Sequence, residues 1–297
     1  MTQFPNGNIK RRENMYILQG PLAFIIRPIY NLIGNYGITL IVATILVRLC
    51  TIPLTIKSQK NTTKTQLLQP EIIKLQNKYK NDRDTLAREM QKVYKKYDVN
   101  PLGGCLPLII QMLILFGFIG VIYNPIECII QLDKATIIKE MKELGQNKEW
   151  IDAVRKIKGQ DVNICGMNGV SEAIISLGKE PINFNLFGMN LAKIPSGSEN
   201  LMQWLFPALA FLATVASSLL TKKQMQAQSK GNEQAASMGN TMLWMMPAMT
   251  LFFIFMMPIA MSLYWFVSTA LQLLQQTVIN KAITNKIQSE ITLKGKK

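Results

Sequence analysis

The sequence predicts an all-α polytopic membrane protein: a five-transmembrane-helix core with a cytoplasmic helical hairpin and an N-terminal interfacial helix. Hydrophobic residues make up 48% of the 297 positions, and they gather in blocks instead of following the short periods of a soluble domain. Most blocks reach the ~20 residues that a bilayer-spanning helix needs, and the fourth is shorter but uncharged. The predicted spans are residues 37–56, 102–123, 201–220, 241–258 and 259–279.

Composition excludes several classes of protein. A net charge of +15 is compatible with nucleic-acid binding, but the charges lie between the apolar blocks, which favours a membrane protein without nucleic-acid specificity. The chain contains no histidine, and its four cysteines show no CxxC spacing, so we expect no metal site, no cofactor and no histidine-based catalysis. Cys128 and Cys165 would share the external segment, where they either form a disulfide or stay free thiols. No cleavable signal peptide is predicted.

The distribution of positive charge predicts the orientation. Residues 57–101 carry eleven Lys and Arg, and further basic residues follow the third and fifth spans. By the positive-inside rule these segments face the cytoplasm, which places the N-terminus outside and the C-terminus inside the cell membrane. The external residues 124–200 carry nine basic and ten acidic residues and are too long to obey the rule, while basic residues near the N-terminus argue weakly against this orientation.

The segments between the spans have distinct patterns. Residues 1–36 form an external segment with an amphipathic helix, which lies at the membrane interface or packs on the bundle. Residues 57–101 are predicted to form a helical hairpin whose apolar stripes face each other. The outer faces of this hairpin are basic. They are either a surface exposed to solvent or a site of contact with anionic lipids or a ribosome. Residues 124–200 form an external loop or small ectodomain of undetermined role. The cytoplasmic loop is 221–240 and the basic tail 280–297.

Arg48 is the candidate functional residue. It lies inside the first predicted span, about 12 Å from the cytoplasmic end at ~1.5 Å per residue. Snorkelling toward that end is disfavoured because Cβ atoms tilt toward a helix N-terminus. The predicted spans contain no acidic residue that could form an ion pair with it. An intramembrane charge costs at least ~2.5 kcal/mol, so we expect Arg48 to face a hydrated cavity.

Other polar and aromatic residues extend this candidate site. Thr44 precedes Arg48 by one helical turn and lies on the same face. Gln111 in the second span either lines the same cavity or forms an interhelical hydrogen bond. The same two alternatives hold for three glutamines of the fifth span, Gln272, Gln275 and Gln276. Tyr264 and Trp265 are, by default, aromatic residues of the membrane interface.

These residues resemble those of the YidC-type membrane protein insertases, in the form found in Gram-positive bacteria. The matching segments lie in the same order over residues 30–123 and 182–280; they are 38–40, 47–48, 53–55, 68–72, 78–80, 100–108 with Gln111-Met112, 263–265 and 275–276. The run at 100–108 is the most specific. The chain lacks the large periplasmic domain of Gram-negative members, and its segment 124–200 is longer than the usual loop.

The resemblance implies a five-helix core around a hydrophilic groove open to cytoplasm and lipid. Arg48 corresponds to the groove arginine, Thr44 to the threonine beside it and Trp265 to the aromatic residue that contacts substrates. The implied partners are nascent membrane proteins, the ribosome, membrane lipids and, in some cases, the Sec translocon.

The function predicted is therefore membrane protein insertion and chaperoning, not enzymatic catalysis. The positive groove attracts the acidic external segment of a client, and burial of the client's apolar helix in lipid drives insertion without nucleotide hydrolysis. No P-loop motif is present. The alternative is an intramembrane anion transporter or channel, which would also use an arginine but for which we find no inverted repeat.

Overall fold

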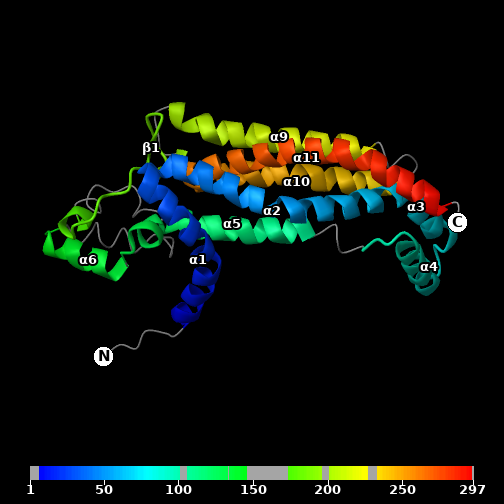
Figure 1. The fold of residues 1–297 in the computed structure, drawn as a ribbon, viewed down its shortest axis with the longest axis horizontal. Coiled ribbons are helices and arrows are strands. Elements are labelled where there is room, and N and C mark those ends of the chain that lie inside the picture. Colours follow the sequence, from blue (N-terminus) through cyan, green and yellow to red (C-terminus); the bar gives the residue numbers. More distant parts are fainter. Residues whose placement is uncertain are drawn as a thin grey trace. The chain divides into compact units, whose positions relative to one another are not determined.

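The chain is mostly helical. The computed structural model describes residues 7–100, 106–132, 134–145, 173–195, 201–226 and 233–295. In the order of Figure 1, its elements are α1 (Gly7–Ile33), α2 (Tyr36–Leu67), α3 (Gln69–Lys78), α4 (Arg83–Lys96), α5 (Leu106–Tyr123), the π-helix η2 (Ile126–Ile130), α6 (Lys134–Glu143), strands β1 (Asn185–Leu186) and β2 (Met189–Asn190), the 3-10 helix η5 (Leu201–Trp204), α9 (Leu205–Gln226), α10 (Glu233–Met256) and α11 (Ile259–Gly295).

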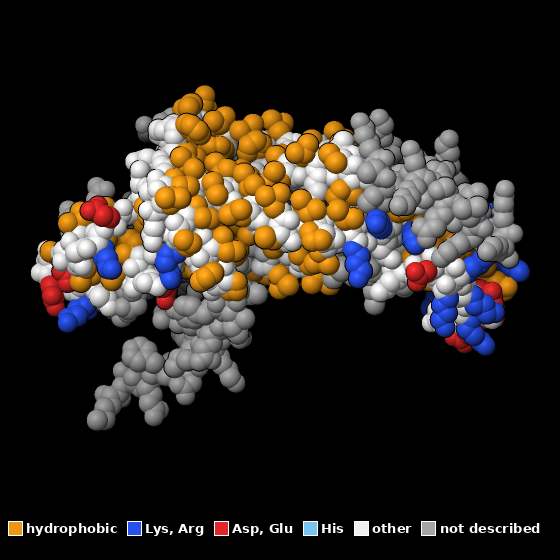
Figure 2. Space-filling view, in the orientation of Figure 1, with side chains coloured by type: hydrophobic (Ala, Val, Ile, Leu, Met, Phe, Trp, Pro, Cys, Tyr) orange, Lys and Arg blue, Asp and Glu red, His pale blue; other side chains and the backbone are white. Residues whose placement is uncertain are grey.

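Two stretches of the described residues have the length and composition of a membrane span: Tyr36–Thr65 in α2, and Leu201–Lys222 in η5 and α9. Shorter apolar helical stretches follow the same pattern at Gly20–Ile33, Ile109–Tyr123 and Pro247–Met256. In Figure 2 hydrophobic side chains are exposed along α9, as lipid-facing helices require. These stretches are consistent with an all-α membrane protein, and the count of five spans stays a prediction.

Several helices continue well past the predicted ends of the spans. Helix α2 reaches Leu67 and α11 reaches Gly295, whereas the corresponding apolar blocks end at 56 and 279. The helical turns beyond residues 56 and 279 are polar. They remain helical because the backbone hydrogen bonds of a helix form in water as well as in an apolar environment. Ile56 and Leu67 of α2 pack against Ile279 and Ile287 of α11 where the predicted spans end and these polar turns begin.

Chain contacts divide the protein into two compact units. Unit 1 comprises Met1–Leu46, Gln111–Ala210 and Phe252–Val267, and unit 2 comprises Val47–Ile110, Phe211–Leu251 and Ser268–Lys297. The boundaries fall inside helices α2, α5, α9, α10 and α11.

In unit 1 a short β-hairpin caps the starts of two helices. Tyr36, the first residue of α2, donates its backbone N–H to the carbonyl of Asn183 at 3.0 Å. Ile259 and Ala260, which begin α11, donate to the carbonyls of Lys193 and Leu191, both at 2.9 Å. The first N–H groups of a helix lack partners within the helix, so residues 183–193 supply the acceptors for both.

Helix α1 is fixed to η2 by an arginine. The guanidinium of Arg27 donates to the carbonyl oxygen of Cys128 from Nε at 3.2 Å and from Nη2 at 3.0 Å. Leu22 and Ile26 are buried, while Ile33 near the end of the same helix is 36% exposed. Burial raises the pKa of the Cys128 thiol to about 12, with Glu127 adding to the rise and Arg27 opposing it. Cys165 lies outside the described residues, so a disulfide between the two cysteines stays a prediction.

In unit 2 helices α3 and α4 pack on each other. Their shared core is made of Leu68, Ile72, Tyr97 and Val99, with Met90, Val93 and Tyr94 packed against it. Of the apolar stripes expected from the sequence, Leu75, Tyr79 and Leu86 remain half-buried, because the contact is centred nearer the base of the pair.

The base of the α3–α4 pair is tied to α2. The side chain of Asn61 donates to the carbonyl of Asn100 at 2.6 Å and accepts the N–H of the same residue at 3.1 Å. Asp98, with a φ of 53°, turns the chain back toward α2 at this point. The two hydrogen bonds therefore close the segment between Asn61 and Asn100.

Candidate functional site: an arginine within a membrane helix

Arg48 lies in the apolar part of α2 and is held by polar side chains of α11. Its Nη2 donates to the hydroxyl oxygen of Ser268 at 2.6 Å and to Oε1 of Gln272 at 3.4 Å. Ser268 is buried, Arg48 is half-buried and Gln272 is exposed. Ser268 and Gln272 are four residues apart and thus project from the same face of α11. Both of these partners are neutral, so the two hydrogen bonds orient the guanidinium without cancelling its charge.

Thr44 is buried four residues before Arg48 in the same helix. Its hydroxyl donates to the backbone carbonyl of Leu40 at 2.6 Å, the usual bond of a helical threonine to the preceding turn. The hydroxyl oxygen keeps acceptor capacity only for a group packed against it, since Thr44 is 2% exposed. Thr51 and Thr55 make the same kind of bond in the next turns of α2.

Gln111 and Tyr264 are brought together in unit 1. The amide of Gln111 in α5 donates to the Tyr264 hydroxyl of α11 at 3.5 Å, the long end of the hydrogen-bonding range. The Tyr264 ring is buried and stacks on Phe118 of α5, with centroids 4.3 Å apart. Tyr264 is therefore a packed residue joining α5 to α11, which differs from its default assignment as an exposed interfacial aromatic.

Trp265 is half-buried next to Tyr264 in α11. Its ring lies 6.1 Å from that of Phe253 in α10, at a tilt of 36°. The side chain is thus partly covered by an aromatic neighbour and partly open. This leaves room for contact with an apolar segment, which is the role that the sequence resemblance assigns to it.

Ser268 is the residue that the sequence did not single out. A serine within an apolar helix is unremarkable by itself, and nothing in the sequence states that it faces Arg48. Its spacing of four residues from Gln272 is the one available signal, because Gln272 is itself a candidate for this polar surface. Gln275, a further candidate from the sequence, has its amide nitrogen buried with no hydrogen-bond partner.

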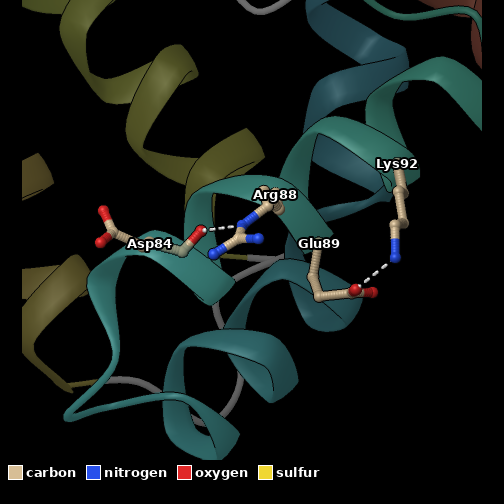
Figure 3. Close-up of polar contacts among 4 residues, drawn as sticks. All are labelled: Asp84, Arg88, Glu89 and Lys92. Atoms are coloured by element: carbon tan, nitrogen blue, oxygen red, sulfur yellow. Dashed lines mark hydrogen bonds and ion pairs between the residues drawn. The ribbon is translucent and has the colours of Figure 1, made fainter.

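A second candidate surface is the outer side of α4. Figure 2 shows basic side chains gathered over this helix. Lys92 is 71% exposed and pairs with Glu89 at 2.6 Å, and Nε of Arg88 donates to the backbone carbonyl of Asp84 at 3.4 Å (Figure 3). Exposed pairs of this kind add little stability, so α4 presents a solvated and mainly basic face.

The described residues offer no setting for a metal ion: none of their His, Cys, Asp and Glu side chains form a group of three or more. The site that the structure does show is a guanidinium hydrogen-bonded to the neutral polar side chains of Ser268 and Gln272. Together with the apolar helices, this defines the class: an all-α membrane protein that carries an arginine inside one of its apolar helices.

The comparisons with known proteins identify the family within this class. Residues 28–286 match the family model described as the 60Kd inner membrane protein. The chain is also 31% identical to "Membrane protein insertase YidC 2" of Bacillus anthracis, over 87% of this chain and 78% of that protein. The chain belongs to this family, the YidC family of membrane protein insertases.

Two further relatives carry the name "Membrane protein insertase YidC". The protein of Treponema denticola is 31% identical over 90% of this chain and 38% of its own length. That of Fusobacterium nucleatum is 40% identical over 37% of this chain and 54% of its own length. The chain thus spans about a third to a half of these two relatives and about three quarters of the Bacillus protein.

Proposed function

We propose that this protein inserts membrane proteins and helps them fold, using Arg48 as a fixed positive charge within a hydrophilic intramembrane groove. The hydrogen bonds from Arg48 to Ser268 and Gln272 carry the proposal. Family membership and the insertase names of the relatives support it. Thr44, Gln111, Tyr264 and Trp265 stay the further groove residues predicted from the sequence.

The partners of Arg48 determine what the charge can do. A carboxylate partner would neutralise the guanidinium, but the five predicted spans contain no acidic residue. Serine and glutamine oxygens align with the guanidinium and reduce the cost of burying it, while a net positive charge remains. An acidic segment of a client would therefore be attracted to it. Two opposite charges 4 Å apart gain about 4 kcal/mol at an effective dielectric of 20, against about 1 kcal/mol in water.

The driving force for insertion then comes from the client itself. Once its polar external segment has entered the groove, its apolar helix can move sideways into lipid. Burial of ~20 apolar residues is favourable without any other energy source. We propose that the cycle needs neither nucleotide hydrolysis nor a bound cofactor, and that the protein is not an enzyme.

The proposed orientation follows from the basic segments. With five spans, α3, α4 and the C-terminal tail face the cytoplasm, and the N-terminus and residues 124–200 face outward. The basic surface of α4 then lies where a ribosome or an emerging client arrives. We propose the ribosome, nascent clients and anionic membrane lipids as partners of this surface, and the Sec translocon as a partner for some clients.

Reconstitution of the purified protein into liposomes tests the proposal. A single-span client with an acidic external segment is offered to vesicles with the wild-type protein, Arg48→Ala or Arg48→Lys, and its protease-protected fraction is measured. We expect loss of insertion with Ala and substantial retention with Lys. A client with a neutral external segment is the matched control and should depend less on Arg48. Equal insertion by the Ala variant would refute the charge mechanism, and anion flux without insertion would favour a transporter.

A further inference from the structure

The turn of the β1–β2 hairpin places a phenylalanine in a backbone conformation that this residue type rarely adopts. Asn185 pairs with Asn190 and Leu186 with Met189, so the connection consists of Phe187 and Gly188 alone. Both residues have positive φ, 50° for Phe187 and 77° for Gly188, which defines a type I′ turn. Glycine fits its position. The first position of such turns favours asparagine, aspartate or glycine, because a residue with a bulky side chain is strained there.

The aromatic ring of Phe187 is also exposed, which is unfavourable in water. Its side chain is 75% exposed at the tip of the hairpin. A strained backbone and an exposed aromatic ring are two separate costs, and an asparagine at position 187 would remove both. Strain of this kind at an exposed position indicates a contact that the isolated chain does not include.

The hairpin holds the ring rigidly. On the inner side Leu186, Met189 and Leu191 are buried, and Gly37 of α2 lies so close that a Cβ there would be 2.7 Å from the side chains of Leu186 and Leu191. The flanking backbone also accepts the first N–H groups of α2 and α11. Phe187 therefore projects from a base that cannot readily turn the ring inward.

The position of the hairpin indicates what surrounds the ring. Strand β2 contacts η5, the first turn of the candidate membrane span Leu201–Lys222, and Figure 1 shows the hairpin beside the start of α9. Leu201 in η5 is 85% exposed and Met202 is 51% exposed. Exposed apolar side chains at the end of a membrane span face lipid, so the lipid-facing surface continues from α9 to the base of the hairpin.

We propose that Phe187 is an anchor for the lipid interface: its ring lies in the boundary between headgroups and acyl chains and fixes the ends of α2 and α11 at that depth. Phenylalanine, like tryptophan and leucine, is among the side chains that interfacial elements bury at this boundary. The polar groups of the hairpin suit the headgroup layer, since Asn183, Asn190 and Lys193 lie in or beside the two strands. A rigid hairpin inserts its ring with little loss of conformational freedom. This anchor does not depend on the proposed insertion activity.

A spin label at position 187 tests the proposal. The variant Phe187→Cys, in a background with the native cysteines replaced, is labelled and reconstituted into phosphatidylcholine–phosphatidylglycerol vesicles. Collision rates with oxygen, which concentrates in the bilayer, and with a water-soluble nickel chelate are then measured. Leu212→Cys on α9 gives the lipid reference, and Arg88→Cys on α4 gives the aqueous reference. We expect a ratio of oxygen to nickel collisions at least several-fold above that at Arg88.

A second variant keeps the test valid if the labelled protein does not fold. Phe187→Trp, with the four native tryptophans replaced by phenylalanine, keeps the aromatic ring at the tip, and its fluorescence should be quenched by lipids brominated near the headgroup. A collision ratio equal to that at Arg88, together with unquenched fluorescence, overturns the proposal and shows a solvated ring. A site shielded from both oxygen and nickel also overturns it, because protein and not lipid would cover Phe187.

Discussion

Removing the hydroxyl of Ser268 should eliminate the shorter of the two hydrogen bonds that orient the Arg48 guanidinium. Ser268→Ala eliminates the acceptor that lies 2.6 Å from Nη2 and leaves the longer bond of 3.4 Å to Gln272. A hydrogen bond to a charged group contributes about 1.5–3 kcal/mol. Because Arg48 is only half-buried, we expect the lower end of that range, about 1.5 kcal/mol.

A double-mutant cycle measures this coupling directly. The free energies of unfolding in detergent are compared for wild type, Ser268→Ala, Arg48→Met and the double variant. Thr277→Val on α11 is the matched control, because its hydroxyl donates to the carbonyl of Leu273 in its own helix and it lies about 13 Å farther along the helix from Ser268. The Thr277 cycle with Arg48 should be additive.

The same variants connect the geometry to activity. If a correctly oriented guanidinium attracts the client, Ser268→Ala should slow insertion of the acidic client by about threefold to tenfold, corresponding to about 0.7–1.4 kcal/mol. The neutral client should be affected less. Additivity of Ser268→Ala and Arg48→Met within about 0.5 kcal/mol would show that the two side chains do not act together, and the positioning argument would fail.

Three other changes test the fold and its orientation. In intact cells, Lys193→Cys should react with an impermeant thiol reagent and Asn81→Cys should not; the reverse labelling would contradict the proposed topology. Asp82 caps α4, and its pKa is lowered, first by its hydrogen bond with the Thr85 side chain. The cap is therefore complete above the ordinary pKa of 3.8 and is lost as the pH falls through the lower pKa of the folded protein. Hydrogen exchange in the first turn of α4 should become faster in that pH range, and Asp82→Asn should abolish this pH dependence. Gly37→Ala should destabilise unit 1 by about 1–3 kcal/mol through overpacking, measured by thermal unfolding, whereas Gly20→Ala, with nothing within 4 Å of the added Cβ, should not.

The sequence predicts the helical class well because its dominant signal is one-dimensional. An uninterrupted apolar block specifies a membrane helix whatever lies beside it, and α2 and η5–α9 satisfy this criterion in the structure. Family membership, inferred from short motifs around Arg48, Pro70 and Gly103, is confirmed by the match over residues 28–286. The number of spans, their orientation and the groove itself remain predictions.

Side-chain partners were less accessible to sequence reasoning. Tyr264 and Trp265 are neighbours of similar chemistry, yet the first is buried against Phe118 and the second is half-open. Which of them packs depends on the rotation of α11, and its apolar residues are too evenly distributed around the helix to fix that rotation. Ser268 was missed for the same reason. The β-hairpin was missed because Phe187-Gly188 lacks the Asn-Gly or Asp-Gly signal typical of two-residue turns.

The capping of α2 by residues 183–193 has a consequence for the biogenesis of this protein itself. Asn35 and Asn185, which are hydrogen-bonded at the start of α2, are 150 residues apart in the chain. During synthesis α2 is made long before the segment that completes its first turn, and the start of α11 is made long after that segment. In the proposed orientation α2 therefore enters the bilayer with these backbone donors still solvated, and its outer end reaches its final position only when the middle of the chain has crossed. An unmet donor inside lipid costs several kcal/mol, so the early helix should stay near the water interface until then.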